Sequence, residues 1–306
     1  MIKSWKNKNL TSLKNKRIVI TGTTSGLGLE TLKHLASLNC EIVIGVRDTK
    51  KAEKQKTEIL KFFPNAKIDI FKLDLTDIES ISSFSKNIKN HFSSGFDALV
   101  NNAGIFAQPK QILNSGYEKH FFTNTLAPII LSKSLLPSLQ KQPNSKIVFV
   151  GSISFNKANI SANNIDLANE KNNIKSYANS KRWLIFYSLA LAKKLKEENS
   201  NTSVTICNPG ISGTSLMNPK NGTFSNILYK ITSTGQKILF HSPKKASLTE
   251  LFSIIAKTEN FEWISPKIFG IWGYPKISKL KIKHFKKEDI SFCYDKIEEI
   301  IQNLQM

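Results

Sequence analysis

The sequence predicts a single-domain α/β fold with a doubly wound parallel sheet that helices cover on both faces. Short β-rich segments alternate with longer helical segments through the first 210 of the 306 residues, and glycines cluster directly after the first β-rich segment. Strand–helix alternation implies right-handed crossovers between parallel strands, whose two faces both need covering. No internal repeat or linker interrupts the pattern, so one domain is the simplest division.

Each buried strand is predicted from a short apolar run, and each helix from apolar residues at helical spacing. The expected strands are Arg17–Thr21, Glu41–Val46, Lys67–Leu73, Ala98–Val100, Lys146–Val150 and Ser203–Cys207. The expected helices are Leu27–Leu38, Lys50–Phe62, Ile78–His91, Glu118–Leu139 and Ser176–Glu198. Beyond Gly210 the pattern weakens, and we expect a helix at Lys244–Ala256 and a last strand within Ile264–Ile271.

The chain divides into a main domain and two extensions on this pattern. Residues 1–15 are expected to form a basic N-terminal extension, residues 16–275 the domain, and residues 276–306 a C-terminal extension. Within the domain, residues 212–236 mix Gly, Ser, Thr, Asn and Pro with short apolar runs, and residues 211–240 are expected to form a substrate lid.

The formal net charge of +21 raises the question of an anionic partner. The lysines are spread over much of the chain, whereas nucleic-acid binding needs a clustered basic footprint, so no nucleic acid is expected. Aromatic residues beside lysines near the C-terminus leave peripheral contact with an anionic membrane open. No apolar run reaches about 18 residues, so no membrane span is expected.

Cysteine usage favours a cytoplasmic location without a structural metal. The three cysteines are widely spaced and show neither a disulfide framework nor the spacing of metal ligands. The N-terminal segment also lacks the apolar stretch that a secretory signal requires.

The glycine-rich segment Thr21–Gly28 predicts a loop that binds the phosphates of a dinucleotide. It follows a predicted strand and precedes an amphipathic helix. Glycines at this point permit a tight turn and a close approach of the backbone to a pyrophosphate, and the helix offers free N–H groups. A purely structural turn is the alternative.

Three motifs of this chain resemble those of the short-chain dehydrogenase/reductase family. Thr21–Gly28 has the spacing of the family's first motif, Asn101–Gly104 matches its Asn-Asn-Ala-Gly motif, and Asn208–Gly210 matches a segment beside the nicotinamide. The resemblance, which covers about Lys16 to Thr214, implies a Rossmann fold and an NAD(P)-dependent oxidoreductase. It implies that the cofactor is bound by Gly22, Thr24, Ser25, Gly26, Leu27, Gly28, Arg47, Asp74, Leu75, Asn101, Ala103, Gly104, Tyr177, Lys181, Pro209, Gly210 and Thr214.

Arg47 favours NADP(H) over NAD(H), which remains the alternative cofactor. It follows the second predicted strand, where NADP-preferring family members carry a basic residue, and an arginine there can pair with the 2′-phosphate. The alternative is a solvated loop charge. The resemblance also places Asp74 against the adenine, although Asp74, Thr76 or Asp77 could each cap the next helix.

Tyr177 and Lys181 are the expected chemical centre. They are four residues apart, so on a helix they share one face. A nearby ammonium would lower the pKa of the phenol, which could then act as acid toward a carbonyl and as base toward an alcohol. Ser152 ends the fifth strand and is expected to hydrogen-bond the substrate oxygen. Asn124 completes the family's catalytic set by holding a helix distortion, with an exposed helical asparagine as the alternative.

These residues predict an enzyme that interconverts a ketone or aldehyde and an alcohol by hydride transfer, with Tyr177 as general acid and base. The long stretch between Ser152 and Tyr177 is similar to that of retinol-dehydrogenase-like and protochlorophyllide-reductase-like members. Residues 211–240 and those near Phe106 are expected to close over the substrate. The apolar residues of this segment suggest an apolar substrate, and the alternative is that they pack on the core. A catalytically silent dinucleotide sensor and a peripheral-membrane enzyme acting on a lipid-like substrate are the alternatives. Homodimer, homotetramer and monomer all stay open.

Overall fold

The computed structural model describes residues 2–158, 170–210, 242–282, 286 and 288–304. Within them, eight strands form one sheet in the order β3-β2-β1-β4-β5-β6-β7-β8. Neighbouring strands pair in parallel except β7 and β8, which are antiparallel. The strand order reverses between β1 and β4, and ligands of such sheets bind beyond the carboxyl ends of the strands at this point. The expected doubly wound sheet is confirmed.

The strands lie within two residues of their predicted ends up to β6. Their bounds are β1 Arg17–Thr21, β2 Glu41–Val46, β3 Lys67–Lys72, β4 Ala98–Asn101, β5 Ser145–Val150, β6 Thr202–Cys207, β7 Glu262–Ile268 and β8 Trp272–Lys279. The sequence did not predict β8, because glycine and proline are both depleted in strands. This strand crosses the expected boundary between residues 275 and 276.

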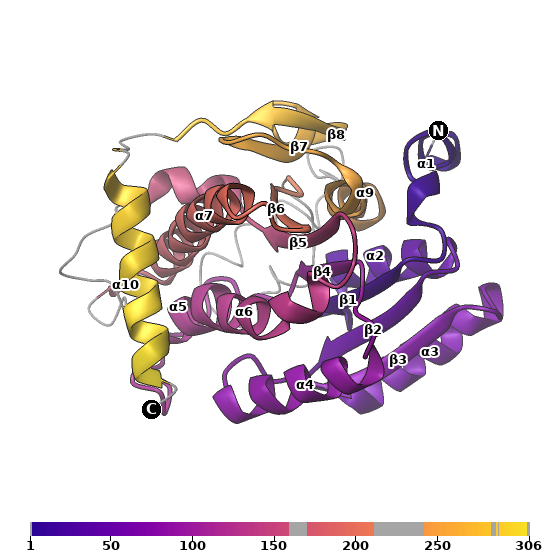
Figure 1. Cartoon of the computed structure of the whole chain (residues 1–306), viewed down its shortest axis with the longest axis horizontal. Coiled ribbons are helices and arrows are strands. Elements are labelled where there is room, and N and C mark those ends of the chain that lie inside the picture. Colours follow the sequence, from indigo (N-terminus) through magenta and orange to yellow (C-terminus); the bar gives the residue numbers. More distant parts are fainter. Residues whose placement is uncertain (1, 159–169, 211–241, 283–285, 287, 305–306) are drawn as a thin grey trace, which may run out of the picture.

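Helices cover both faces of the sheet (Figure 1). Their bounds are α1 Ile2–Asn9, α2 Gly26–Ala36, α3 Thr49–Phe62, α4 Ile78–His91, α5 Lys119–Phe121, α6 Ala127–Leu139, α7 Asn173–Glu197, α9 Pro243–Ile255 and α10 Glu288–Leu304, with shorter turns at η1 Thr11–Leu13, η2 Phe122–Leu126 and η3 Ile153–Lys157. One core cluster takes its helical side chains mainly from α4, α6, α7 and α10. The other takes them from α2, α3 and α9. Two cores on opposite faces are what alternating crossovers produce.

Polar caps decide where several helices begin. Asp48 caps α3 by accepting from the Lys51 N–H, and Asp77 caps α4. Asn172 caps α7, since its Oδ1 accepts from two backbone N–H groups of the first turn. Each such cap contributes about 1 kcal/mol to stability. The Asn172 cap thereby sets the start of the helix that carries Tyr177.

The C-terminal helix α10 packs against α7 (Figure 1). The Tyr187 hydroxyl donates to Glu298 Oε1 at 2.6 Å, and the same carboxylate forms an ion pair with Lys133 of α6. The rings of Tyr187 and Tyr294 stack with their centroids 5.1 Å apart. This helix therefore covers the outer side of α7 with both polar and apolar contacts.

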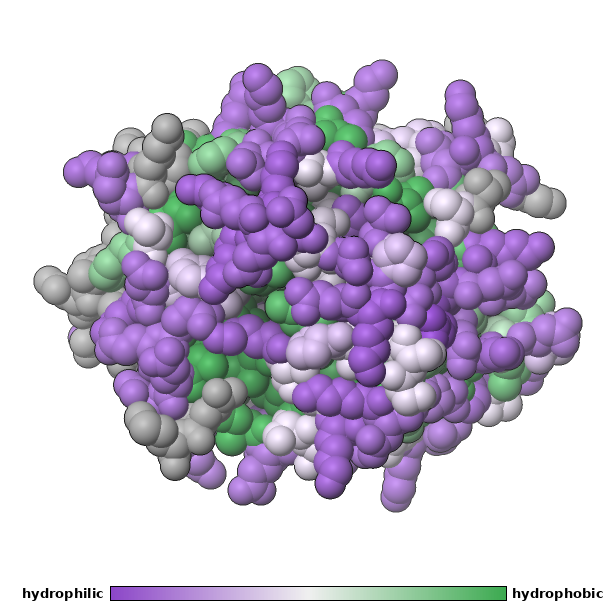
Figure 2. Space-filling view, in the orientation of Figure 1, coloured by the Kyte–Doolittle hydropathy of each residue, from purple (hydrophilic) through white to green (hydrophobic). Residues whose placement is uncertain are grey.

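The surface is dominated by hydrophilic side chains with smaller apolar areas between them, as Figure 2 shows for one face. Among the described residues, no helix has the length and apolar character needed to cross a membrane. In the same part of the chain no group of His, Cys, Asp and Glu side chains could hold a metal ion. Cys40, Cys207 and Cys293 are buried free thiols.

A buried carboxyl group joins α9 to the helix that follows the glycine-rich loop. Glu250 is fully buried, and Thr31 Oγ1 donates to its Oε2 at 2.5 Å. Its Oε1 has no hydrogen-bond partner among the described residues. Burial therefore raises the pKa of Glu250 to about 7, although the hydrogen bond from Thr31 opposes the shift.

Glu250→Gln is expected to stabilise the fold above pH 7 but not at pH 5. Between the ordinary pKa of 4.5 and about 7, the folded chain holds a proton that the unfolded chain has released. Stability is therefore lost as the pH rises through this range. We expect the variant to melt about 5 °C above the wild type at pH 8 in scanning calorimetry. Glu53→Gln, the same change at an exposed site of α3, should leave the melting temperature unchanged at both pH values. An equal rise in melting temperature for Glu250→Gln at pH 5 and pH 8 would contradict the raised pKa of Glu250.

Candidate active site

The two glycine-containing motifs of the N-terminal half pack directly on each other. Gly22 has a φ of +72°, and a Cβ there would lie 2.7 Å from Ala103 Cα. A Cβ at Gly28 would lie 2.4 Å from Asn102 Nδ2. Contacts this short exclude any side chain at either glycine, so the loops after β1 and β4 form one surface.

Hydrogen bonds hold these loops together. Asn102 Nδ2 donates to the carbonyl oxygens of Thr21 at 2.7 Å and Gly22 at 2.9 Å, and the Ala103 N–H donates to Thr21 Oγ1. Asn101, which was expected at the cofactor, turns its side chain toward α6 and donates to Ser132 Oγ. Asn102 was not among the predicted site residues, although its place in the Asn101–Gly104 motif was a signal for it.

The loop after β1 is suited to bind a pyrophosphate. Ser25 precedes α2 without forming a side-chain cap, so the first N–H groups of this helix are not used by its hydroxyl. Such groups, together with the positive end of the helix dipole, attract phosphate oxygens. Gln55 of α3 holds the loop from the other side by donating to the Thr24 carbonyl at 2.7 Å.

The residues expected around the adenosine differ in their exposure and in their hydrogen-bond partners. Arg47 follows β2 and is exposed, while Asp48 is used as the α3 cap. Asp74 Oδ1 accepts from both the N–H and the hydroxyl of Thr76, so Asp74 shapes its own turn, whereas Asp77 is the cap of α4. Leu75 packs into the apolar core.

Asn124 lies in a π-helical turn, η2, between α5 and α6. It is 1% exposed, so the alternative of an exposed helical asparagine is wrong. Its Oδ1 accepts from the Ile105 N–H at 2.8 Å, and its Nδ2 donates to the Ile105 carbonyl and to Ser180 Oγ. The π-helical turn therefore directs the Asn124 side chain toward both the loop after β4 and helix α7. Such turns are frequent at functional sites.

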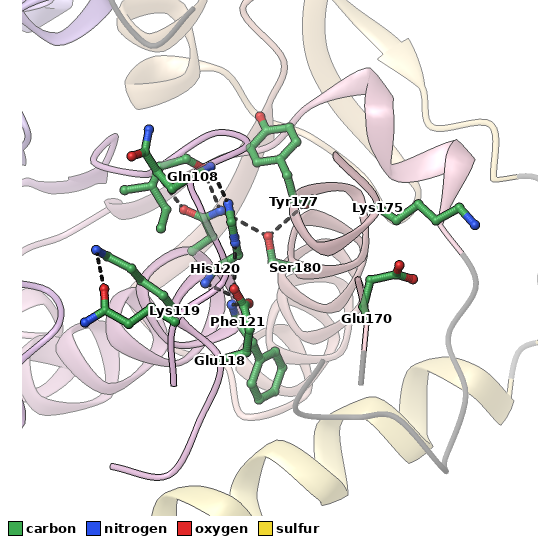
Figure 3. A network of polar contacts seen from close by, with 12 residues as sticks. Gln108, Glu118, Lys119, His120, Phe121, Glu170, Lys175, Tyr177 and Ser180 are labelled. Atoms are coloured by element: carbon green, nitrogen blue, oxygen red, sulfur yellow. Dashed lines mark hydrogen bonds and ion pairs between the residues drawn. The ribbon is translucent and has the colours of Figure 1, made fainter. Parts of the chain in front are cut away.

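Tyr177, Lys181 and Ser152 come together at the carboxyl end of β5. Ser152 is close enough to Tyr177 to oppose the rise of the phenol pKa, and Lys181 Nζ donates to the Val150 carbonyl at 2.8 Å. A Cβ placed on Gly104 would lie 3.7 Å from Lys181 Nζ, so the lysine also lies next to the loop after β4. In Figure 3 the Tyr177 hydroxyl is directed away from the body of α7.

The pKa of Tyr177 is not lowered, contrary to what its spacing from Lys181 had predicted. Burial raises the pKa of Tyr177, with the nearby Ser152 side chain opposing, and burial lowers the pKa of Lys181 to about 8. The expected lowering of the phenol pKa by Lys181 is therefore not what the fold produces. The reason is that desolvation penalises both charged forms while Lys181 is bonded to a backbone carbonyl.

A second serine, Ser154, supports Ser152. Its N–H and its hydroxyl both approach Ser152 Oγ, at 3.3 and 2.9 Å. Ser152 is thereby oriented from the helical turn η3 that follows β5. Ser154 was not predicted, because its hydroxyl reaches Ser152 only through the turn that the chain makes after β5.

The segment Asn208–Gly210 is fixed to the hairpin between β7 and β8. Asn208 Nδ2 donates to the Gly270 carbonyl at 2.8 Å. Gly210 has a φ of +81°, and a Cβ there would lie 2.5 Å from the Ile271 oxygen. Pro209 thus lies at the carboxyl end of β6, beside β5. Thr214 and the expected lid at residues 211–240 lie outside the described residues.

Comparison with known proteins gives a consistent match. Residues 16–223 match the family model described as short chain dehydrogenase. The Brassica napus protein "Short-chain dehydrogenase TIC 32 B, chloroplastic" is 32% identical over 211 residues, which are 66% of this chain and 66% of that protein. Human "Retinol dehydrogenase 11" is 28% identical over 270 residues, 88% of this chain and 81% of that one. The chain thus spans slightly less than two thirds of the chloroplast relative.

Solved structures support the fold. A crystal structure of an uncharacterized protein from Mycobacterium Paratuberculosis superposes with a TM-score of 0.76 at 22% identity, covering 96% of each chain. A structure from Pseudomonas syringae, titled as a short chain dehydrogenase, gives a TM-score of 0.62 at 20% identity over 80% of this chain and 90% of that one. At these identities the likeness concerns the architecture.

Proposed function

Since this chain belongs to the short-chain dehydrogenase family, we propose that it interconverts a carbonyl compound and an alcohol with NADP(H), and that Tyr177 is its general acid and base. The observation that carries the proposal is the convergence of Tyr177, Lys181 and Ser152 at the carboxyl end of β5. Lys181, one helical turn beyond Tyr177 on α7, donates to the carbonyl of Val150, two residues before Ser152. A phenol and a hydroxyl that meet in this way offer two donors to one substrate oxygen.

The residues present fit a nicotinamide dinucleotide, which when bound supplies or accepts the hydride. The glycine loop and the N-terminus of α2 would bind its phosphates, and the loop after β4 together with Lys181 and Pro209 would face its nicotinamide half. The other predicted contacts, including that of Thr214, follow from the family resemblance.

The chain's own contribution is proton control and orientation. Ser152, held by Ser154, accepts or donates a hydrogen bond at the substrate oxygen and keeps it next to Tyr177. The raised pKa of Tyr177 keeps its proton on the phenol, which suits donation to a carbonyl oxygen that becomes an alkoxide. Lys181, protonated below about pH 8, is held by the Val150 carbonyl beside the loop after β4, where it would contact the nicotinamide half of the cofactor.

A cofactor titration followed by a carbonyl panel tests the proposed function. NADPH and NADH are titrated by fluorescence, and the tighter one is used with aldehydes and ketones of increasing apolar length. We expect tighter binding of NADPH and turnover that improves with the apolar character of the substrate. Binding of either nucleotide without oxidation by any carbonyl would favour a silent dinucleotide sensor instead.

Arg47→Glu is expected to weaken NADPH binding about 30-fold while changing NADH binding less than about threefold, since a hydrogen-bonded charge pair is worth roughly 1.5–3 kcal/mol. The reason is that Arg47 is exposed at the end of β2, next to the glycine loop, with room to meet a 2′-phosphate. Lys54→Glu, the same charge change at an exposed site of α3, is the matched control. Equal losses for both nucleotides would show that Arg47 acts through general charge alone.

A further inference from the structure

The loop after β4 is held at two points by side chains from one helical turn. Asn124 binds both the N–H and the carbonyl of Ile105, and His120 Nε2 accepts from the Gln108 N–H at 3.1 Å. His120 and Asn124 are four residues apart, at the start of the segment that runs from α5 into η2. We call Ile105–Gln108, with its two attachments, the clamped loop.

A buried carboxylate fixes the orientation of His120. Glu118 and His120 are both fully buried, and Glu118 Oε1 lies 2.7 Å from His120 Nδ1 (Figure 3). Because Nε2 accepts from a backbone N–H, the ring proton belongs on Nδ1, where it is donated to Glu118. The other oxygen of Glu118 accepts from the N–H groups of His120 and Phe121. The imidazole is thus held from both nitrogens.

The clamped loop contains backbone strain. Ala107, midway between the attachments, has a φ of +45°, in the left-handed region that alanine rarely adopts. Such conformations persist where surrounding contacts determine them, and they concentrate at functional sites. The contacts from Asn124 and His120 are the ones on either side of this residue.

Phe106, which precedes the strained Ala107, contacts the phenol ring of Tyr177. The rings of Phe106 and Tyr177 meet edge to face, with centroids 4.8 Å apart and planes at 80°. Phe106 is partly exposed, so it is not a core residue. A ring at this distance from the acid occupies space beside any substrate whose oxygen meets the Tyr177 hydroxyl.

We propose that Phe106 determines substrate specificity by excluding branching next to the carbonyl, and that His120 and Glu118 are positioning residues that act through it. The inference rests on the proposed function, since it concerns the substrate of the same site. The favoured class is a straight-chain aldehyde or ketone whose chain leaves the carbonyl without an α-branch. His120 and Glu118 do not touch the substrate.

A double-mutant cycle tests this inference with two aldehydes of equal carbon number, one straight and one α-branched. The measured quantity is the ratio of kcat/KM for the branched over the straight substrate. Phe106→Ala is expected to raise it about tenfold, in the range that added space gives in apolar pockets. His120→Ala should raise it in the same direction by a smaller factor. The double variant should match Phe106→Ala, because a residue that acts through Phe106 has no effect once Phe106 is removed.

Other outcomes overturn the inference. If His120 has a purely structural role, His120→Ala will lower kcat/KM for both aldehydes equally. If His120 acts independently of Phe106, the changes in the ratio from the two single variants will multiply in the double variant. If His120→Ala does not fold, His120→Gln, which keeps most of the side-chain volume, takes its place in the cycle. His91→Ala, at a histidine of α4 away from the clamped loop, should leave the ratio unchanged.

The wild type separates this inference from the proposed function. Turnover of the straight aldehyde with a ratio that Phe106→Ala does not change rejects the specificity role alone. A wild type that oxidises NADPH with neither aldehyde nor any of the carbonyl panel rejects the proposed function, and this inference with it.

Discussion

Tyr177→Phe is expected to lower kcat about 10³-fold while leaving the Kd for NADPH within about twofold, because positioned acid–base groups contribute about 10²–10⁴. The substitution removes one oxygen atom, the proposed donor to the carbonyl, and keeps the ring that packs against Phe106. The nearby Ser152 stays oriented by Ser154, so the rest of the site should persist. Single-turnover rates with saturating NADPH, beside a fluorescence titration of the nucleotide, measure the two quantities separately.

Tyr187→Phe is the matched control for this prediction. Tyr187 is also on α7 and is more deeply buried, but its hydroxyl bonds Glu298 of α10 on the far side of the helix from the site. Its loss should lower the melting temperature and leave kcat unchanged. Should Tyr177→Phe keep more than a tenth of the wild-type kcat, the phenol would not be the proton donor.

Asn124→Ala is expected to cost about 3 kcal/mol of unfolding free energy, since a buried polar group left without a partner costs roughly 1–3 kcal/mol. The change removes the partners of the Ile105 N–H and carbonyl and a bond to Ser180, which itself donates to the Tyr177 carbonyl. Activity should fall as well, because the same bonds hold the clamped loop against α7. Urea unfolding followed by circular dichroism gives the first quantity, and kcat at a temperature where the variant is folded gives the second.

Asn87→Ala makes the same substitution at an exposed position of the regular helix α4. It should change the unfolding free energy by less than about 0.5 kcal/mol, as surface substitutions usually do. A similarly small effect for Asn124→Ala would mean that the backbone of the clamped loop finds other partners and that the π-helical turn does not depend on this side chain.

The sequence by itself determined the order of strands and helices up to β6. Each of these elements has its own apolar periodicity over a few residues, and this periodicity can be recognised without knowing which segments pack against it. The Gly-rich loop and the sequence Asn101–Gly104 were recognisable for the same reason. The antiparallel strand β8 was missed because Gly273 and Pro275 interrupt its local signal, while its pairing with β7 is a long-range property.

Only the tertiary structure decided how the site is built. It turned Asn124 inward through a π-helical turn, placed His120 against a backbone N–H of the clamped loop, and brought Phe106 to Tyr177. It also reversed the expected direction of the Tyr177 pKa shift, because desolvation depends on every group packed around the phenol. Spacing along a helix states which side chains share a face, whereas burial, strain and hydrogen-bond partners arise from segments far apart in the chain.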